Sequence, residues 1–252
     1  MGIYVITGGT TGIGAATRDH LHHQGHRTVN LDLKAGDHQV DLSNPEQYIP
    51  VLREVAQAHP EINGIVTCAG VASHFPDTGK ILDINFWGTV NVVEALRGNL
   101  SEGGRVVVIS SNSAPQCSKP ELVEAMLAND REAALTLATE YSGHDCYSGS
   151  KHAIARWVRR EAPQFARQGI SLNAIAPGYI ETPMTQAVAQ SEEYGEAIKQ
   201  FVASIPLGRP GKPEDIASLI GFLLSPEAHF IAGSLMYADG GHDALFRPNQ
   251  GP

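Results

Sequence analysis

The sequence predicts a single α/β domain built on a doubly wound parallel sheet. Strand-like and helix-like segments alternate along all 252 residues, a pattern typical of βα units that cover both faces of one sheet. A glycine-rich turn follows the first strand-like segment, and neither an internal repeat nor a linker divides the chain. In such a sheet, ligands bind at the carboxyl ends of the strands.

The glycine-rich turn is Thr7-Gly8-Gly9-Thr10-Thr11-Gly12-Ile13-Gly14. A buried strand is predicted over 3–6 because this run is β-branched and aromatic, and a helix is predicted over 15–24. Gly8 lets the chain turn off the strand, while Gly12 and Gly14 leave room for a close ligand. The free N–H groups of the helix N-terminus attract a pyrophosphate. The arrangement favours a Rossmann-type dinucleotide site over a ligand-free turn.

Asp32 ends the second predicted strand, over 28–31, and bears on the choice of cofactor. A carboxylate at this point accepts hydrogen bonds from both hydroxyls of an adenosine ribose and repels a 2′-phosphate. The glycine turn carries no Arg or Lys from position 10 to 13, although Lys34 follows Asp32 by two residues. We therefore expect NAD rather than NADP. Taken alone, Asp32 would more readily be interpreted as a solvated turn residue.

Composition limits the class of protein. The formal charge of −9 and the absence of a long basic run argue against nucleic acid or an anionic membrane as partner. No apolar run approaches the roughly 18 residues of a membrane span, and no signal peptide is recognisable. Three scattered cysteines suit free thiols in a reducing cytoplasm. We expect no metal and a small-molecule substrate.

The rest of the chain continues the alternation. Further strands are predicted over 39–42, 64–67, 105–109, 170–174 and 234–237, and helices over 45–58, 81–96 and 213–224. Asp41, near the end of the third strand, either hydrogen-bonds an adenine edge or N-caps the helix over 45–58. The strand over 105–109 delivers Ser110 and Ser111 to the carboxyl edge of the sheet.

One segment departs from this rhythm. The residues between Ser111 and Tyr147 contain no strand pattern, and they predict helices over 120–128 and 131–141, with Asp130 as an N-cap. Apolar residues at i, i+3, i+4 and i+7 form a stripe on each helix. We therefore expect a helical insert, about 113–143, beside the site.

The chemical centre is predicted at Tyr147-Ser148-Gly149-Ser150-Lys151. On a helix, Lys151 lies one turn from Tyr147 and shares its face. A nearby cation lowers the pKa of a phenol, and an acid–base group works best with a pKa near the operating pH. The pair predicts a proton donor for a ketone or an acceptor for an alcohol. By itself the spacing is common, and it gains meaning from the glycine turn, Asp32, Ser111 and Asn85.

These motifs together resemble the short-chain dehydrogenase/reductase family over essentially the full length. Further matches are Ala69-Gly70, Asn85, Pro177-Gly178 with Thr182, and Asp239-Gly240-Gly241. Within the family the chain looks most like the bacterial 3α-hydroxysteroid dehydrogenase/carbonyl reductases, with a comparable insert; coniferyl-alcohol dehydrogenases are similar too. Cys68 departs from the family, which usually has Asn there, and the separation of Ser111 from Tyr147 is longer than the family norm.

The resemblance implies a role for each matching residue. Tyr147 is the acid–base, Lys151 lowers its pKa and holds the nicotinamide ribose, and Ser111, with Ser110 as the alternative, binds the substrate oxygen. Asn85 holds a relay water through its main-chain carbonyl. Cofactor contacts are expected at Gly8, Thr10, Thr11, Gly12, Ile13, Gly14, Asp32, Asp41, Leu42, Cys68, Ala69, Gly70, Ile109, Tyr147, Lys151, Pro177, Gly178, Ile180, Thr182 and Met184.

The expected function is therefore an NAD-dependent oxidoreductase that interconverts a bulky apolar secondary alcohol and its ketone. A 3α-hydroxysteroid or a xenobiotic carbonyl is suggested by resemblance alone. An aromatic-alcohol dehydrogenase of the coniferyl type and a non-catalytic NAD-sensing protein are the alternatives. The segment 184–205 is expected to form a mobile lid, and the tail after Gly241 to line the mouth.

The expected assembly is a homodimer. Many family members pair through the helices that bear Asn85 and Tyr147, but here the insert enters directly before the Tyr147 helix and is expected to cover that face. The alternative face is the helix over 213–224 with the strand over 234–237. Ile216, Leu219, Ile220 and Leu223 form a stripe on that helix, although most such stripes face their own core.

Overall fold

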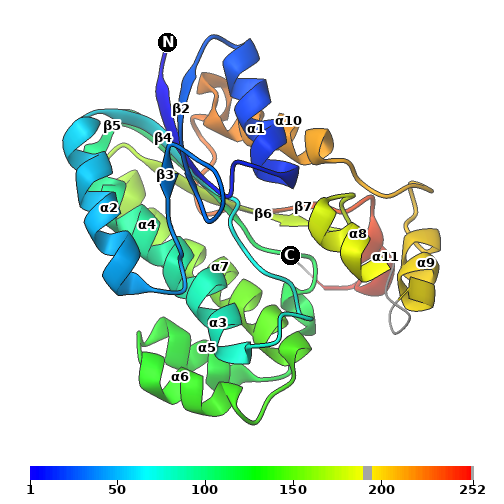
Figure 1. Cartoon of the computed structure of the whole chain (residues 1–252). Coiled ribbons are helices and arrows are strands. Elements are labelled where there is room, and N and C mark those ends of the chain that lie inside the picture. The colour runs from blue at the N-terminus through cyan, green and yellow to red at the C-terminus, as the bar shows by residue number, and fades with distance from the viewer. Residues whose placement is uncertain (190–194, 251–252) are drawn as a thin grey trace.

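The computed structural model describes residues 1–189 and 195–250 and contains one seven-stranded parallel sheet (Figure 1). The strand order is β3-β2-β1-β4-β5-β6-β7. The chain builds the sheet outward from β1 to β3 and then crosses over to continue outward from β4 on the other side of β1. The strands are β1 Ile3–Thr7, β2 Arg27–Asp32, β3 His38–Gln39, β4 Ile62–Thr67, β5 Leu100–Ile109, β6 Ser171–Pro177 and β7 Leu235–Ala238. This order confirms the predicted Rossmann-type fold.

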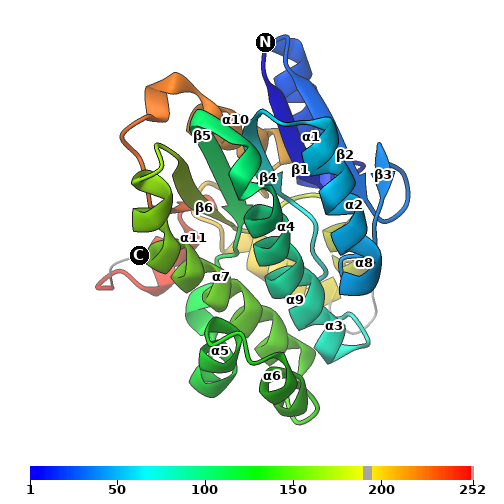
Figure 2. The ribbon, with the colours of Figure 1, turned by 90° about the vertical axis from the view of Figure 1, so that its left-hand side faces the viewer.

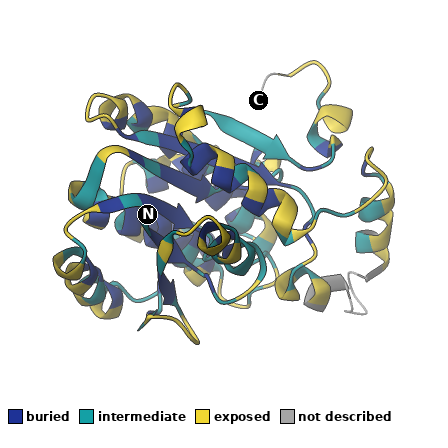
Figure 3. Ribbon diagram, turned by 90° about the horizontal axis from the view of Figure 1, so that it is seen from above, coloured by how far each residue is buried: buried dark blue, intermediate teal, exposed yellow. Residues whose placement is uncertain are grey.

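Helices cover both faces of the sheet, as Figures 1 and 2 show. On one face lie α1 Gly12–His23 and α10 Pro213–Leu224, which pack against each other; on the other lie α2 Pro45–Ala58, α4 Thr89–Leu96 and α7 Gly143–Ala166. Each layer closes its own apolar core, with Leu21 and Ile220 in the first and Leu52, Val92 and Trp157 in the second. Figure 3 shows the buried strands between helices whose outer faces are exposed.

Strand register brings the chemistry-bearing segments to one edge. Thr7 pairs with Leu31 of β2 and with Thr67 of β4, and Thr67 pairs in turn with Val108 of β5. Because all these strands are parallel, the residues that follow them meet at the carboxyl edge. The glycine turn, Asp32, Cys68 and the two serines therefore lie along one rim.

The segment before α7 forms two short helices, α5 Pro120–Leu127 and α6 Arg131–Ala138. The side chain of Asp130 accepts a hydrogen bond from the N–H of Ala133 at 3.0 Å, which confirms the predicted N-cap. Their apolar stripes are buried: α5 packs on α7, and α6 packs on α5 and on α3 Thr78–Leu82. Figures 1 and 2 both place the pair at the end of α7 remote from the N-terminus of the chain.

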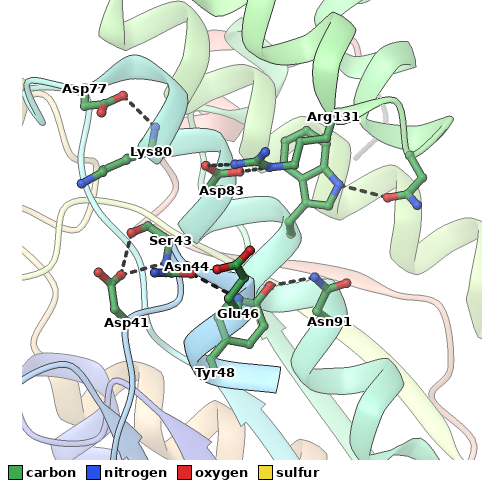
Figure 4. A network of polar contacts seen from close by, with 12 residues as sticks. Asp41, Ser43, Asn44, Glu46, Tyr48, Asp77, Lys80, Asp83, Asn91 and Arg131 are labelled. Carbon is green, nitrogen blue, oxygen red and sulfur yellow. Dashed lines mark hydrogen bonds and ion pairs between the residues drawn. The ribbon is translucent and has the colours of Figure 1, made fainter. Parts of the chain in front are cut away.

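An ion pair between a half-exposed arginine and a buried carboxylate fastens this helical pair to the helices beside the sheet. Arg131 donates two hydrogen bonds, of 2.7 and 2.8 Å, to the carboxylate of Asp83, whose side chain is 9% exposed (Figure 4). Close by, the indole N–H of Trp87 donates to Asn129 at 3.0 Å. Asn129 has a φ of +59°, a conformation in the left-handed region that asparagine tolerates better than most residues.

Three predicted elements differ from the structure. The helix over 81–96 is interrupted by a π-helix, η1 Asp83–Gly88, between α3 and α4. The third strand is only His38–Gln39, so Asp41 lies in a turn and accepts hydrogen bonds from the N–H and hydroxyl of Ser43. The N-cap of α2 is Asn44, which accepts from the N–H of Glu46, and the capping alternative for Asp41 was wrong.

The apolar stripe on α10 does not face outward. Ile216, Ile220 and Leu223 are fully buried in the core beneath the helix, against α1, because their spacing places them on the sheet side. The exposed aromatic side chain of this helix is Phe222, and Phe230 before β7 is 95% exposed. The stripe is therefore an internal packing surface, and any contact with a second copy uses other residues.

The remaining helices lie at the carboxyl edge or in connections: η2 Arg97–Asn99, η3 Ala114–Gln116, α8 Pro183–Ala189, α9 Gly195–Ala203, η4 Pro226–Ala228 and α11 His242–Phe246. The predicted lid contains α8 and α9, and its residues 190–194 lie outside the described part. Across residues 1–189 and 195–250, no helix has both the length and the apolarity that a membrane crossing requires.

Candidate active site

The glycine turn has the tight geometry that a dinucleotide site needs. Gly8 has a φ of +68°, and a Cβ atom added there would lie 2.7 Å from the main-chain nitrogen of Ala69. A Cβ atom on Gly12, whose φ is +56°, would lie 3.1 Å from the Thr182 side chain. The segment carrying Thr182 therefore lies directly over the turn, above the N-terminus of α1. A side chain at Gly8 would collide with Ala69, and a side chain at Gly12 would press against Thr182, so both positions favour glycine.

Asp32 and Thr10 lie together at the end of β2. One carboxylate oxygen of Asp32 accepts from the N–H of Thr10 at 3.1 Å, and the other accepts from the N–H of Lys34 at 3.1 Å. Deeper in the turn, Asn30 accepts from the N–H of Gly9 at 2.9 Å. These contacts fix the carboxylate at the rim and leave lone pairs that can accept further hydrogen bonds.

Cys68, Ala69 and Gly70 follow β4 and form the floor of the site. The N–H of Ala69 donates to the hydroxyl of Thr7 at 3.1 Å, which joins β4 to β1 where the glycine turn begins. The Cys68 thiol lies close enough to Lys151 for its charge to lower the thiol pKa, yet burial outweighs this and raises it to about 12. Cys68 is therefore a neutral thiol in the floor of the site.

Asn85 lies in the π-helix and is fully buried. Its side-chain amide accepts from the N–H of Val71 at 2.9 Å and donates to the Val71 carbonyl at 3.0 Å. These two bonds clamp the segment after Gly70 against η1. A Cβ atom on Gly70 would lie 3.1 Å from the Asn85 side chain and 3.7 Å from Lys151. The side chain of Asn85 is thus a brace for the loop that passes the lysine.

The two serines at the end of β5 have different surroundings. The Ser110 hydroxyl donates to the main-chain carbonyl of Lys151 at 2.8 Å, so it ties β5 to α7. The Ser111 hydroxyl instead lies near the Tyr147 phenol and acts to lower the phenol pKa, although burial raises that pKa more. Both serines are buried. The geometry therefore favours Ser111 over Ser110 as the substrate-binding serine.

Tyr147 and Lys151 share one face of α7, as the i, i+4 spacing predicted, but their pKa values are not shifted as expected. Lys151 donates to the carbonyl of Ile109 at 2.9 Å, and its ammonium lies 5.9 Å from the centre of the Tyr147 ring. Burial raises the pKa of Tyr147 from its ordinary value and lowers the pKa of Lys151 to about 8. Loss of hydration is the largest cause of both shifts.

The opposite wall of the site comes from the segment after β6. The N–H of Gly178 donates to the Ala238 carbonyl at 3.1 Å, and Ile180 bridges to Gly211, which places this segment along the rim. The Thr182 hydroxyl pairs with the Thr185 hydroxyl at 3.1 Å. Met184, at the start of α8, is 41% exposed.

Most predicted site residues are therefore brought to one rim, and the two residues that follow the short third strand, Asp41 and Leu42, lie at its edge. Leu42 is buried beside Gly88 of the π-helix. The Asp41 carboxylate accepts a hydrogen bond from the Ser43 hydroxyl. Sequence reasoning missed Ser113, whose hydroxyl donates to the Ser111 hydroxyl at 2.9 Å. The signal available in the sequence was a second serine two residues after Ser111.

The site combines a dinucleotide cradle with an acid–base phenol, and this combination defines an oxidoreductase that uses a nicotinamide cofactor. Comparison with known proteins agrees. Residues 33–121 match the family described as short chain dehydrogenase, and residues 133–243 match the one described as enoyl-(acyl carrier protein) reductase. The chain belongs to the short-chain dehydrogenase/reductase family.

Individual relatives cover nearly the whole chain. The 3-alpha-hydroxysteroid dehydrogenase/carbonyl reductase of Comamonas testosteroni is 37% identical over 99% of this chain and 100% of its own. The solved 3-alpha-hydroxysteroid dehydrogenase from Pseudomonas sp. B-0831, complexed with NADH, has a TM-score of 0.93 at 36% identity and covers 99% of this chain and 100% of its own. A cis-4-hydroxycyclohexanecarboxylate dehydrogenase from Sinomonas cyclohexanicum is 26% identical over 96% and 97% of the respective chains.

Proposed function

We propose that the protein is an NAD-dependent dehydrogenase/reductase that interconverts a bulky, apolar secondary alcohol and its ketone. The observation on which this rests is the meeting of three groups at the strand edge: the Ser111 hydroxyl near the Tyr147 phenol, and the Lys151 ammonium 5.9 Å from the centre of the Tyr147 ring. Two similar proteins, one curated relative and one solved structure, are named for 3-alpha-hydroxysteroids, and the solved one is complexed with NADH. A 3α-hydroxysteroid or a comparable carbonyl compound is thus the first substrate class to test.

The residues present fit NAD. The glycine turn leaves room for a pyrophosphate at Gly12, where a Cβ atom would approach Thr182, while Gly8 lets the turn pack closely on Ala69. Asp32 at the rim accepts ribose hydroxyls and disfavours a 2′-phosphate. Lys151 would hold the nicotinamide ribose, and Ile180 with Thr182 would hold the carboxamide. When bound, the nicotinamide accepts or supplies the hydride.

The protein's own residues handle the proton. During alcohol oxidation, Tyr147 as phenolate accepts the proton of the alcohol oxygen, and Ser111 donates a hydrogen bond to that oxygen. During ketone reduction, Tyr147 as phenol returns the proton to the same oxygen. Lys151, enclosed beneath the ring, stabilises the phenolate. Asn85 would connect the lysine to solvent through a water held by its main-chain carbonyl.

The substrate mouth is proposed to be formed by the helical insert about 113–143, the lid about 184–205 and the tail after Gly241. The aromatic rings of Phe201 and His242 lie 4.2 Å apart, and those of His242 and Phe246 lie 4.6 Å apart. This stack joins α9 of the lid to α11 of the tail. Because the joined surfaces are aromatic and Met184 is partly exposed, the mouth favours an apolar substrate.

A homodimer in the cytoplasm is also proposed. The insert packs on the Tyr147 helix, so the remaining face for assembly is that of α10 and β7. Exposed Phe222 lies on α10, and exposed Phe230 lies in the connection before β7. A cavity of about 940 Å³ opens beside the end of β7, lined by Leu207, Arg209 and Tyr237 among others. The free thiols of all three cysteines are compatible with a reducing compartment.

The proposal is tested by following reduced-nicotinamide absorbance with a matched panel of steroid and monocyclic alcohols, each with NAD. The expected result is turnover with secondary alcohols, highest for the bulky apolar members. Turnover confined to primary aromatic alcohols would favour the coniferyl type. Tight NAD binding with no turnover of any alcohol or ketone would overturn the enzymatic assignment in favour of a sensor.

A further inference from the structure

Ser113 occupies an unusual position next to the substrate-binding serine. It is the N-cap of the short helix η3, yet its side chain makes no capping hydrogen bond. Serine at an N-cap ordinarily uses its hydroxyl to accept from the first turn of the helix. Here the hydroxyl donates to the Ser111 oxygen at 2.9 Å instead. The Ser113 side chain is thus directed to Ser111 rather than to its own helix.

The main chain of Ser113 makes a second contact with the same atom. Its N–H donates to the Ser111 oxygen at 3.1 Å. A serine hydroxyl has two acceptor sites and one hydrogen to donate. With both acceptor sites filled by Ser113, Ser111 can act towards its remaining neighbour as a donor only. That neighbour is the hydroxyl of Tyr147.

The backbone around Ser113 is held independently of its side chain. The N–H of Asn112 donates to the Pro177 carbonyl at 3.0 Å, and the N–H of Ala114 donates to the Ser111 carbonyl at 3.1 Å. From α7, His152 contacts the Ala114 carbonyl at 3.0 Å. The turn is thus fixed both to the next strand and to the helix that bears Tyr147. Removal of the Ser113 hydroxyl therefore leaves the turn in place.

We propose that Ser113 is a positioning residue for the reaction: it fixes the Ser111 hydroxyl as a donor, to the Tyr147 oxygen in the free enzyme and to the reacting oxygen once substrate is bound. This inference rests on the proposed function. Ser113 does not touch the reacting oxygen; it acts through Ser111. A chain of hydroxyl donors also polarises each member, so the bond from Ser111 to an anionic oxygen is strengthened. The effect is largest where negative charge develops on that oxygen.

The test compares Ser113→Ala with Ser113→Thr, which retains the hydroxyl, and with Ser118→Ala as a control. Ser118 is an exposed serine of the same segment whose only described side-chain bond is to Asp145 at 3.4 Å. We expect Ser113→Ala to lower kcat about fivefold, the net effect of one neutral hydrogen bond, with KM and the Kd for NAD unchanged. The pH at which kcat for oxidation is half-maximal should rise, and Ser113→Thr should restore both values.

A second measurement does not depend on turnover. The ionisation of Tyr147 is followed as the ultraviolet tyrosinate signal that is lost in Tyr147→Phe, and Ser113→Ala should shift this titration to higher pH. Unchanged kcat and titration in Ser113→Ala would overturn the role of Ser113, as would equal losses in the Ala and Thr variants. If the wild type turned over no substrate, the proposed function would fail, whereas the titration would still decide the role of Ser113.

Discussion

Lys151 donates a hydrogen bond of 2.9 Å to the main-chain carbonyl of Ile109, at the end of the strand that also delivers Ser111. The lysine is buried, and its ammonium is held by a strand carbonyl while it lies 5.9 Å from the Tyr147 ring. The geometry therefore presents the lysine as an enclosed cation with a lowered pKa of about 8. A buried group of this kind is a common mark of a functional site, because it is unfavourable for stability.

The role of Tyr147 is tested by Tyr147→Phe. The ring stays and packs as before, so the variant should fold and bind NAD with an unchanged Kd. Loss of general acid–base catalysis typically lowers turnover by about 100- to 10,000-fold, and we expect a fall of this size. Steady-state kinetics with NAD titration by fluorescence measures both quantities. Turnover near that of the wild type would remove Tyr147 from the mechanism.

The cofactor preference is tested by Asp32→Ala. Wild-type protein should show a lower KM and a higher kcat with NAD than with NADP, because the carboxylate at the rim binds ribose hydroxyls and repels a phosphate. The alanine variant should show a smaller preference for NAD, because it binds NAD more weakly and no longer repels the 2′-phosphate of NADP. Asp37→Ala is a control nearby, since Asp37 accepts from the N–H of Asn30 rather than facing the glycine turn. A wild-type preference for NADP would contradict the assignment.

The lowered pKa of Lys151 predicts a specific pH dependence of stability. The folded protein releases the lysine proton near pH 8, whereas the unfolded chain holds it to about 10.5. Between these pH values the unfolded state binds more protons, so the free energy of unfolding rises with pH. From pH 7 to about pH 9 the gain is on the order of 1 kcal/mol.

Urea unfolding of wild type and Lys151→Met at several pH values measures this contribution. The thiols of Cys68 and Cys146 have raised pKa values in the folded protein. Above about pH 9 the unfolded chain loses these protons first, so the thiols lower the free energy of unfolding in both proteins. The difference between wild type and Lys151→Met therefore isolates the lysine, and it should change between pH 7 and 9. Lys199→Met, at an exposed lysine, should show no such change. A constant difference would mean that Lys151 is not titrating near pH 8.

From the sequence alone, the positions of the candidate site residues were predicted better than the packing of the elements around them. Pro45 and Pro213 fix helix starts because proline suits the first turn, and both boundaries were predicted correctly. The π-helix at Asp83–Gly88 escaped prediction because an added residue shifts the apolar periodicity only locally. Tyr147 and Lys151 were recognisable by spacing, since i, i+4 positions share a helix face, whereas Ser111 was indicated by its place after the strand over 105–109 and by the family resemblance.

Other errors share one cause: sequence patterns do not specify which of two partners a side chain takes. Asp41 and Asn44 both suit the start of α2, and the turn geometry gives the cap to Asn44. The stripe on α10 was compatible with either a partner or its own core, and it faces the core. The pKa of Tyr147 depended on burial, which spacing does not reveal.

The ion pair between Arg131 and Asp83 predicts how firmly the helical insert is held. Arg131→Ala would leave the carboxylate of Asp83 enclosed with both hydrogen bonds lost, which should lower the free energy of unfolding by about 3 kcal/mol. Arg156→Ala is the matched control. It also breaks a contact between the insert and α7, but the Arg156–Glu124 pair is exposed, so the loss should stay below about 1 kcal/mol. Equal losses in urea unfolding would contradict this account.

The last prediction concerns assembly. Phe230 is 95% exposed and Phe222 is 43% exposed, whereas the stripe of α10 is buried in its own core. A large aromatic side chain left in water is unfavourable, and burial against a second copy would remove this exposure. We therefore expect the wild type to have the mass of two chains in light scattering, and Phe230→Asp to shift it towards one chain with its fold retained. Phe246→Asp, at an exposed aromatic residue of α11, shows whether the tail takes part. A mass near four chains, or an interface formed mainly by the Asn85 and Tyr147 helices, would rule out the proposed dimer.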